Sequence, residues 1–447
     1  MTQHKHWAGL AAFAGAASLA LPGLAQAADG WTISGSMRVR YEAVAGQARP
    51  GFNAGDELVN LRTTVFAEHR SGALRIGGEV YDSRAWGGDR ATPISTNDVN
   101  TFEPVQTYVA MDLKTTVLGP ISVLAGRSML NLGSRRLVAA DDYRNTTNSY
   151  TGLRLDMAPA GLRTTLIYVR PQLRLPDGLD AVLDNRHRLD RESSDLELWG
   201  GVAAKPEALG PATLEGSFFH LEERDAAARP TRDRSLDTVG VRVLLEPRPA
   251  AFDYEIEAIH QGGEVSLTAA PRAPRQAVSS DFVHADLGYT YSHRLRPRVS
   301  AEFDWVSGDR AGGKYNRFDT LFGMRRADFA PSGLYAALGR ANIVTSGLRL
   351  EVAPPGAWEA FAAVRTMWLE AREDAFSTTG VRDAAGRSGR YAGAQIEARW
   401  RYWLIKDRLR TEANGVWLAK GRFLKRAPNA PKAGDTRYLS LNLIALF

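Results

Sequence analysis

The sequence predicts an all-β fold, a transmembrane antiparallel β-barrel of about 18 strands with short periplasmic turns and long extracellular loops. Three observations predict it: apolar and polar residues alternate in many segments, the segments have the length of bilayer-crossing strands, and the connections are alternately short and long. In ISGSMRVRYEA, which starts at residue 33, Met37 and Val39 occupy one parity while Arg38, Arg40 and Glu42 occupy the other. Successive side chains of a strand point to opposite faces, so this strand has one apolar and one charged face.

The first 27 residues have the pattern of a secretory signal peptide. Lys5 gives a short basic start, an apolar stretch follows, and Ala25-Gln26-Ala27 matches a small-x-small cleavage site. We therefore expect an exported chain whose residues 28–447 form the barrel. No later run of 18 apolar residues predicts a membrane helix. The absence of cysteine excludes a disulfide framework.

The predicted strands are each roughly 9 to 12 residues long, near the length that a tilted strand needs to cross a bilayer. In PVQTYVAMDLK, for example, Val105, Val109 and Met111 share the apolar parity, opposite Gln106 and Tyr108. Only a closed barrel lets a sheet cross lipid without leaving unpaired backbone groups at an edge. The expected strand starts lie near residues 33, 57, 73, 104, 120, 149, 161, 195, 212, 237, 252, 282, 298, 343, 357, 391, 409 and 437.

The connections alternate between short turns and long polar loops. The short ones include APAG from Ala158, APPG from Ala353 and KDR from Lys406. Outer-membrane barrels place such turns in the periplasm and their longer loops outside the cell, so the sequence predicts a protein of the cell outer membrane. The long loops are predicted at 83–103, 129–148, 171–194, 222–236, 261–281, 307–342, 370–390 and 420–436.

Aromatic residues lie near many predicted strand ends, where aromatic girdles meet the two bilayer interfaces. The outward partners are then outer-membrane lipid and lipopolysaccharide. The last strand, RYLSLNLIALF, ends at Phe447 and has the form that the barrel-assembly machinery recognises in outer-membrane proteins. The candidate girdle residues are Trp31, Tyr41, Tyr81, Trp305, Trp400, Tyr402, Trp403 and Trp417.

The polar parity is expected to line a water-filled lumen, because a barrel of this size has a backbone radius of roughly 18 Å, too wide for side chains to fill. Arginine binds carboxylates in a planar fork, and a row of weak sites lets an anion move from one to the next. The residues predicted to conduct an anion along a basic wall are Arg38, Arg40, Arg62, Arg75, Arg127, Arg136, Arg144, Arg154, Arg349, Arg365, Arg399 and Arg401. The residues predicted to form an opposing acidic wall are Asp253, Glu255, Glu257, Glu302 and Asp304.

A second interpretation of these charges remains open. Carboxylates such as Glu42, Glu68 and Asp112 share the inward parity, and lateral arginine–carboxylate pairs would make the wall rigid rather than attract an anion.

The segment AGRSMLNLGSRRLVAADDYRNTTNSYTGLRLD, residues 125–156, resembles the alginate-export family of outer-membrane porins. The resemblance implies an 18-stranded barrel with an arginine-lined conduit for a polyuronate that leaves the periplasm. The matching positions are Gly126-Arg127, Leu130, Gly133, Arg136-Leu137-Val138, Tyr143-Arg144-Asn145-Thr146, Tyr150, Gly152, Arg154 and Leu155.

The chain also departs from the family pattern. Ser128 stands where the family has Gln, Tyr143 where it has Trp, and Thr151 where an Asp precedes the glycine. The exporter type gates its channel with a long periplasmic loop, but the corresponding turn here is only KDR at 406–408. The loop at 83–103 offers an alternative outer lid. For Arg135, Arg136 and Arg144, ion pairs with Asp141 or Asp142 and contact with the cargo are both open interpretations. A Ca²⁺ ion bound by Asp141 and Asp142 is a further alternative.

The sequence therefore predicts an outer-membrane channel for an anionic polysaccharide or a related sugar acid, with passive diffusion through an arginine-lined lumen. The alternative is a general or nutrient-uptake porin. No cofactor, metal ion or nucleic acid partner is expected. Histidines 220, 260, 284 and 293 accompany no nucleophile motif or HExxH spacing, so an enzyme is not expected.

Overall fold

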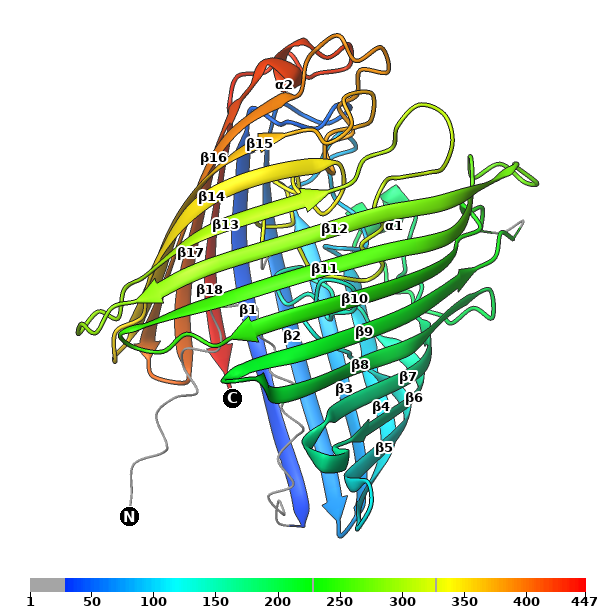
Figure 1. Ribbon diagram of the computed structural model, residues 1–447, viewed down its shortest axis with the longest axis vertical. Coiled ribbons are helices and arrows are strands. Elements are labelled where there is room, and N and C mark those ends of the chain that lie inside the picture. Colours follow the sequence, from blue (N-terminus) through cyan, green and yellow to red (C-terminus); the bar gives the residue numbers. More distant parts are fainter. Residues whose placement is uncertain (1–28, 227–228, 326–327) are drawn as a thin grey trace.

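The computed structural model describes residues 29–226, 229–325 and 328–447, so the predicted signal peptide lies outside the described residues. Eighteen antiparallel strands form one sheet that closes on itself through pairing of β1 (Gly30–Ala45) with β18 (Thr436–Leu446). Figure 1 shows the strands winding obliquely around a single barrel. Within the described ranges no helix has the length and apolar character needed to cross a bilayer.

The observed strands begin within a few residues of the predicted positions, except for β12, which starts seven residues before the predicted residue 282. Strands of 16 or 17 residues, such as β1 and β2, are longer than a bilayer requires and continue beyond it. The remaining strands are β2 Gly55–Ser71, β3 Leu74–Trp86, β4 Asn100–Thr115, β5 Gly119–Ser128, β6 Tyr150–Met157, β7 Arg163–Pro171, β8 Leu196–Leu209, β9 Ala212–Glu223, β10 Ser235–Leu245, β11 Ala251–Ser266, β12 Arg275–Thr290, β13 Arg298–Val306, β14 Ile343–Val352, β15 Trp358–Trp368, β16 Tyr391–Ile405 and β17 Leu409–Lys420.

The alternation of short and long connections is confirmed. The short turns are 72–73, 116–118, 158–162, 210–211, 246–250, 291–297, 353–357 and 406–408. The long loops are 46–54, 87–99, 129–149, 172–195, 224–234, 267–274, 307–342, 369–390 and 421–435, and the first of them was not among the predicted loops. In the described part of these connections lie three short helical segments, η1 Pro159–Gly161, α1 Leu179–Leu183 and α2 Arg422–Arg426.

The two faces of the opening strand differ as predicted. Val39 is 41% exposed on the outer surface, whereas Arg38 on the inner surface is only 3% exposed. The outward residues are apolar along most of the barrel, and such a continuous apolar band is the surface that lipid covers. The seam between first and last strands continues to Phe447, whose backbone N–H and C=O both bond Gly35, at 3.1 and 2.8 Å. A side chain at Gly35 would collide with the Phe447 ring and with the backbone oxygen of Thr64.

Loops fold into the extracellular half of the barrel and explain why the lumen-facing residues are buried. Loops 129–149 and 307–342 meet through a parallel bridge between Val138 and Phe322. Phe329, Leu334 and Tyr335 of the second loop are fully buried and join a hydrophobic cluster with inward residues of the strands. The lumen is therefore narrowed by packed loops rather than open across its full width.

The predicted side-chain directions of Val105 and Tyr81 are wrong. Val105 is buried, although it was placed on the lipid-facing parity with Val109, because an irregularity in the β3–β4 pairing next to Glu79 shifts the alternation. Tyr81, a candidate girdle residue, instead lies beside the Arg62 guanidinium, 5.5 Å from ring centroid to Cζ. The outward position is observed for Trp31 and Trp400, which are both exposed.

Candidate functional site

Arg38 and Arg62, from neighbouring strands β1 and β2, both hold the inward-folded loop 129–149 through its backbone. Arg38 donates from Nη1 to the carbonyl oxygen of Asp142 at 3.2 Å and from Nη2 to that of Arg144 at 2.8 Å. Arg62 Nη1 donates to the same two carbonyl oxygens at 3.3 and 3.1 Å. Carbonyl oxygens are neutral, so these contacts fix the two guanidinium groups without cancelling their charge.

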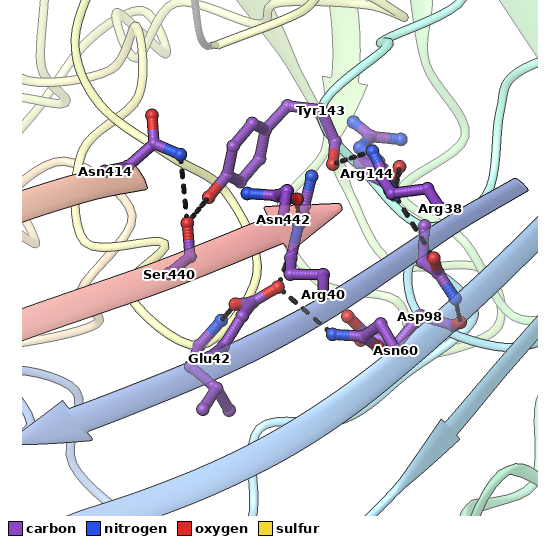
Figure 2. A network of polar contacts seen from close by, with 12 residues as sticks. Arg38, Arg40, Glu42, Asn60, Asp98, Tyr143, Arg144, Asn414, Ser440 and Asn442 are labelled. Carbon is purple, nitrogen blue, oxygen red and sulfur yellow. Dashed lines mark hydrogen bonds and ion pairs between the residues drawn. The ribbon is translucent and has the colours of Figure 1, made fainter. Parts of the chain in front are cut away.

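Tyr143 fastens the same loop to the seam of the barrel, as Figure 2 shows. Its ring lies 3.9 Å below the Arg40 guanidinium, a cation–π contact. Its hydroxyl lies 2.7 Å from the Tyr438 hydroxyl and 3.0 Å from Ser440 Oγ, both on β18. Arg40 itself donates to Asn442 Oδ1 at 2.6 Å and pairs with Glu42 at 3.3 Å. This side of the loop is thus bound by polar groups from β1 and β18.

Arg136 fastens the loop to the opposite side of the barrel. Its guanidinium contacts Asp328 at 2.9 Å and Glu257 at 2.5 Å, and it also pairs with Glu255. Burial alone would lower the pKa of Arg136, but the charges of Asp328, Glu255 and Glu257 outweigh burial and raise this pKa well above its ordinary value. The loop therefore crosses the lumen from the arginines of β1 and β2 to the carboxylates of β11.

Every carboxylate of the predicted acidic wall contacts a basic side chain. Glu255 and Glu257 bind Arg136 of the loop, as described above. Asp253 pairs with Arg298 at 2.5 Å and Glu302 with Arg365 at 3.1 Å, while Asp304 Oδ1 lies 2.7 Å from His284 Nδ1. The carboxylates of this wall therefore belong to ion pairs, and Arg298 is shared between Asp253 and two further carboxylates, Asp286 and Glu351.

Several predicted conducting arginines also have carboxylate partners, in agreement with the wall-stiffening interpretation for these positions. The pairs are Arg75 with Asp112 at 2.9 Å, Arg154 with Asp156 at 2.8 Å, Arg349 with Glu351 at 2.8 Å, and Arg401 with Glu359 at 3.0 Å and Glu412 at 2.5 Å. Arg399 lies 4.8 Å above the Phe361 ring.

Three loop arginines that sequence reasoning missed gather at the extracellular mouth. Burial lowers the pKa of Arg49, Arg174 and Arg325 to about 10 in each case. Repulsion by neighbouring arginines contributes to this lowering, because Arg325 acts on Arg49 while Arg144 acts on both Arg174 and Arg325. Arg49 donates to the Leu334 carbonyl at 3.1 Å and Arg174 to the Asn97 side-chain oxygen at 2.9 Å, which are neutral acceptors. Only the folded loops bring these groups together, so no local sequence signal marks them.

The family model for alginate export matches residues 31–435. The chain belongs to this family. Among curated proteins none matches the chain. In fold the porin is similar to OccAB3 of Acinetobacter baumannii, with a TM-score of 0.59, 11% identity, and coverage of 93% of this chain and 99% of that one. It is also similar to Pseudomonas aeruginosa OccK2 (OpdF) in complex with glucuronate, with a TM-score of 0.57, 12% identity, and coverage of 93% and 98%.

These findings identify an outer-membrane β-barrel porin, and its family and fold are those of channels rather than enzymes. Most of the motif that resembles the alginate-export family lies in the loop that crosses the lumen. Gly126 and Gly152 of that motif face each other across β5 and β6, and a Cβ at either would collide with the neighbouring strand. The periplasmic turn at 406–408 remains short, as predicted, so no long gating loop occurs at that position of this porin.

Arg127 departs from the predicted arginine path of the porin. It shares the parity of Val123, which is 39% exposed, and its guanidinium contacts Glu103 at 2.5 Å and Glu192 at 3.2 Å. In β5 both faces carry apolar residues, because Val123 points outward and Leu124 inward. The alternation therefore does not show which face of β5 meets lipid. Arg127 therefore does not belong to the lumen-facing row.

Asp141 and Asp142 each pair with an arginine of their own loop. Asp141 lies 2.8 Å from Arg144 Nε, and Asp142 lies 2.8 Å from Arg135 Nη2. No cluster of three or more His, Asp or Glu residues with the geometry of a metal site occurs among the residues that the structure describes. The ion-pair interpretation is the one that the geometry favours for these two carboxylates.

Proposed function

We propose that this outer-membrane porin is a passive, anion-selective channel whose cargo is an anionic polysaccharide or a related sugar acid. The observation that carries the proposal is the unequal neutralisation of the two sides of the lumen. Arg38 and Arg62 bind neutral carbonyl oxygens, whereas each acidic-wall carboxylate contacts a basic side chain. The two guanidinium groups therefore keep their positive charge where loop 129–149 narrows the lumen, and this local charge attracts anions.

The chemistry of these arginines suits carboxylates in particular. The guanidinium group is planar, stays charged at all relevant pH values and matches a carboxylate with two parallel hydrogen bonds. Arg174 at the mouth, and Arg62 and Arg38 at the loop that crosses the lumen, offer positive groups that bind neutral acceptors. Conduction requires favourable but weak binding at such successive sites. OccK2, which is similar in fold, was crystallised in complex with glucuronate, and this supports a sugar acid as the class of cargo.

The test is a measurement of ion selectivity in planar bilayers across a potassium chloride gradient. We expect a reversal potential of the sign that reports chloride permeation, and a current that mannuronate oligomers block from either side. Neutral oligosaccharides of the same length serve as the control and are expected to block much less. An unselective current that both oligomers affect equally would contradict the proposal and favour a general porin.

The selectivity is also expected to fall as pH rises through about 7. Burial, reinforced by Glu42, raises the pKa of Asp98 in loop 87–99 to about 7. Because this pKa is raised, the folded state favours the neutral acid, and ionisation at higher pH places a negative charge beside Arg40 and Arg49 while removing some stability. Reversal potentials between pH 5.5 and 8.5 measure the effect. The Asp98→Asn variant should show a flat profile, and a slope that persists in this variant would assign the effect to another group.

A further inference from the structure

A cavity of about 590 Å³ lies at the extracellular mouth, apart from the network around Tyr143. Its walls come from the extracellular ends of β9 to β12 and from residues of loops 224–234, 267–274, 307–342 and 369–390. Leu236, Gln261 and Val278, which are all buried, form its inner wall, so the cavity belongs to the lumen side of the barrel. The volume falls in the range of about 300 to 1,000 Å³ that is usual for small-molecule sites.

Two of the arginines that line this cavity have no neutralising partner. Among the described residues, no carboxylate lies within ion-pair distance of Arg232 or Arg325. The Arg232 Nε donates to the Ser266 carbonyl at 2.9 Å, and its guanidinium lies 4.4 Å above the Tyr315 ring, so its position is fixed. The other arginines of the wall differ, since Arg234 pairs with Glu223 at 2.7 Å and Arg317 with Asp374 at 2.6 Å. The cavity therefore holds two positive groups that a bound anion can neutralise.

The rest of the wall is apolar or already hydrogen-bonded. Leu236, Val278 and Phe318 belong to the hydrophobic cluster of the barrel interior. The Thr378 hydroxyl donates to the Ala336 carbonyl at 2.9 Å, and Gln261 binds both Thr238 and Asp319. Few polar groups remain for the many hydroxyls of a sugar, whose unmet hydrogen bonds would weaken binding. An apolar ring, by contrast, gains from contact with these side chains.

We propose that this cavity is a binding site for a small organic acid that carries its carboxylate on an apolar ring system of one or two rings. The carboxylate lies between Arg232 and Arg325, and the ring packs against Leu236, Val278 and Phe318. This ligand class differs from the sugar acids of the proposed function. At its extracellular mouth the porin would thus bind a second class of ligand, in addition to its cargo.

Calorimetric titration of the purified porin in detergent with 2-naphthoate tests the proposal. We expect saturable binding that Arg232→Gln and Arg325→Gln each weaken by about tenfold or more, because each removes a charged hydrogen-bond donor. Ala269→Trp fills the cavity from an exposed loop position without removing a charge, and it should also abolish binding. Arg248→Gln, on an exposed turn at the other end of the barrel, is the matched control and should bind like the unaltered porin.

Further arms separate this site from the conduction path. The Arg232→Gln variant should keep the reversal potential of the unaltered porin, so a failure of the proposed function and a failure of this site give different results. Glucuronate and 2-naphthalenemethanol should bind more weakly than 2-naphthoate. Equal binding of 2-naphthoate by the arginine variants and the unaltered porin would overturn the proposal, as would tighter binding of glucuronate that these variants lose. Heat-modifiable migration in gels verifies that each variant is folded.

Discussion

Replacing Arg38 and Arg62 together by glutamine is expected to lower the anion-to-cation permeability ratio of the porin by about tenfold or more. A unit charge about 4 Å from a passing ion is worth about 1 kcal/mol even at the dielectric constant of water, and the two effects add. Both guanidinium groups are held at the loop that narrows the lumen, so every permeating ion passes their field. The reversal potential in a salt gradient measures the change.

Charge and loop position can be separated for this pair. Arg38→Lys with Arg62→Lys keeps both charges but loses the forked contacts to the carbonyls of loop 129–149, so the selectivity should be largely retained. Arg170→Gln removes an exposed arginine that pairs with Glu197 at 3.1 Å on the outer surface, and it should change nothing. If the lysine and glutamine pairs lose selectivity equally, the loop contacts and not the charges decide it.

Replacing Arg136 by methionine is expected to lower the free energy of unfolding by about 3 to 5 kcal/mol, the usual cost of removing one partner from a buried ion pair. Glu255, Glu257 and Asp328 would then face one another without their shared cation. Their repulsion should release this end of loop 129–149 and increase the single-channel conductance. Guanidinium unfolding followed by tryptophan fluorescence measures the first effect, and bilayer recordings measure the second.

Removing the opposing charges at the same time should restore most of the stability. In a variant that combines Arg136→Met with Glu255→Gln, Glu257→Gln and Asp328→Asn, no uncompensated charge remains in the cluster, and such replacements are often close to neutral. A conductance that stays at the unaltered level in the single variant would show that the loop is held in place by Tyr143 and the Arg38 contacts alone.

The two-faced strands could be predicted from sequence because one face of each is committed to lipid. Arg38, Arg40 and Arg62 face inward as the alternation predicts, since a one-residue shift would place their charges in the bilayer. The alternation does not predict the side-chain direction where a strand has no clear lipid-facing side. The irregularity beside Val105 shifts the parity near the extracellular end of β4, and in β5 Leu124 and Val123 are both apolar, so Arg127 could not be placed.

The partners of the charged residues could not be predicted, because they depend on register and on long-range loop packing. Arg136 and Glu255 are 119 residues apart in the chain, and nothing in the local spacing links them. His284 and Asp304 lie opposite each other in the register of β12 and β13, and the sequence does not determine that register. The alternation within a strand is a local feature of the sequence. The ion pairs that line the lumen depend on how the whole barrel closes and how its loops pack.

The pairing of Ser36 with Leu446 joins segments separated by nearly the whole chain. Every other neighbouring pair of strands is a hairpin, so this contact has the largest loop-closure entropy of the fold and is expected to form last. Until β1 and β18 pair, the growing sheet has two edge strands. Their unpaired backbone N–H and C=O groups find no hydrogen-bond partners in the hydrocarbon of the bilayer. The strand order thus determines the order of assembly. During insertion, both edge strands must be shielded from lipid until β1 and β18 pair.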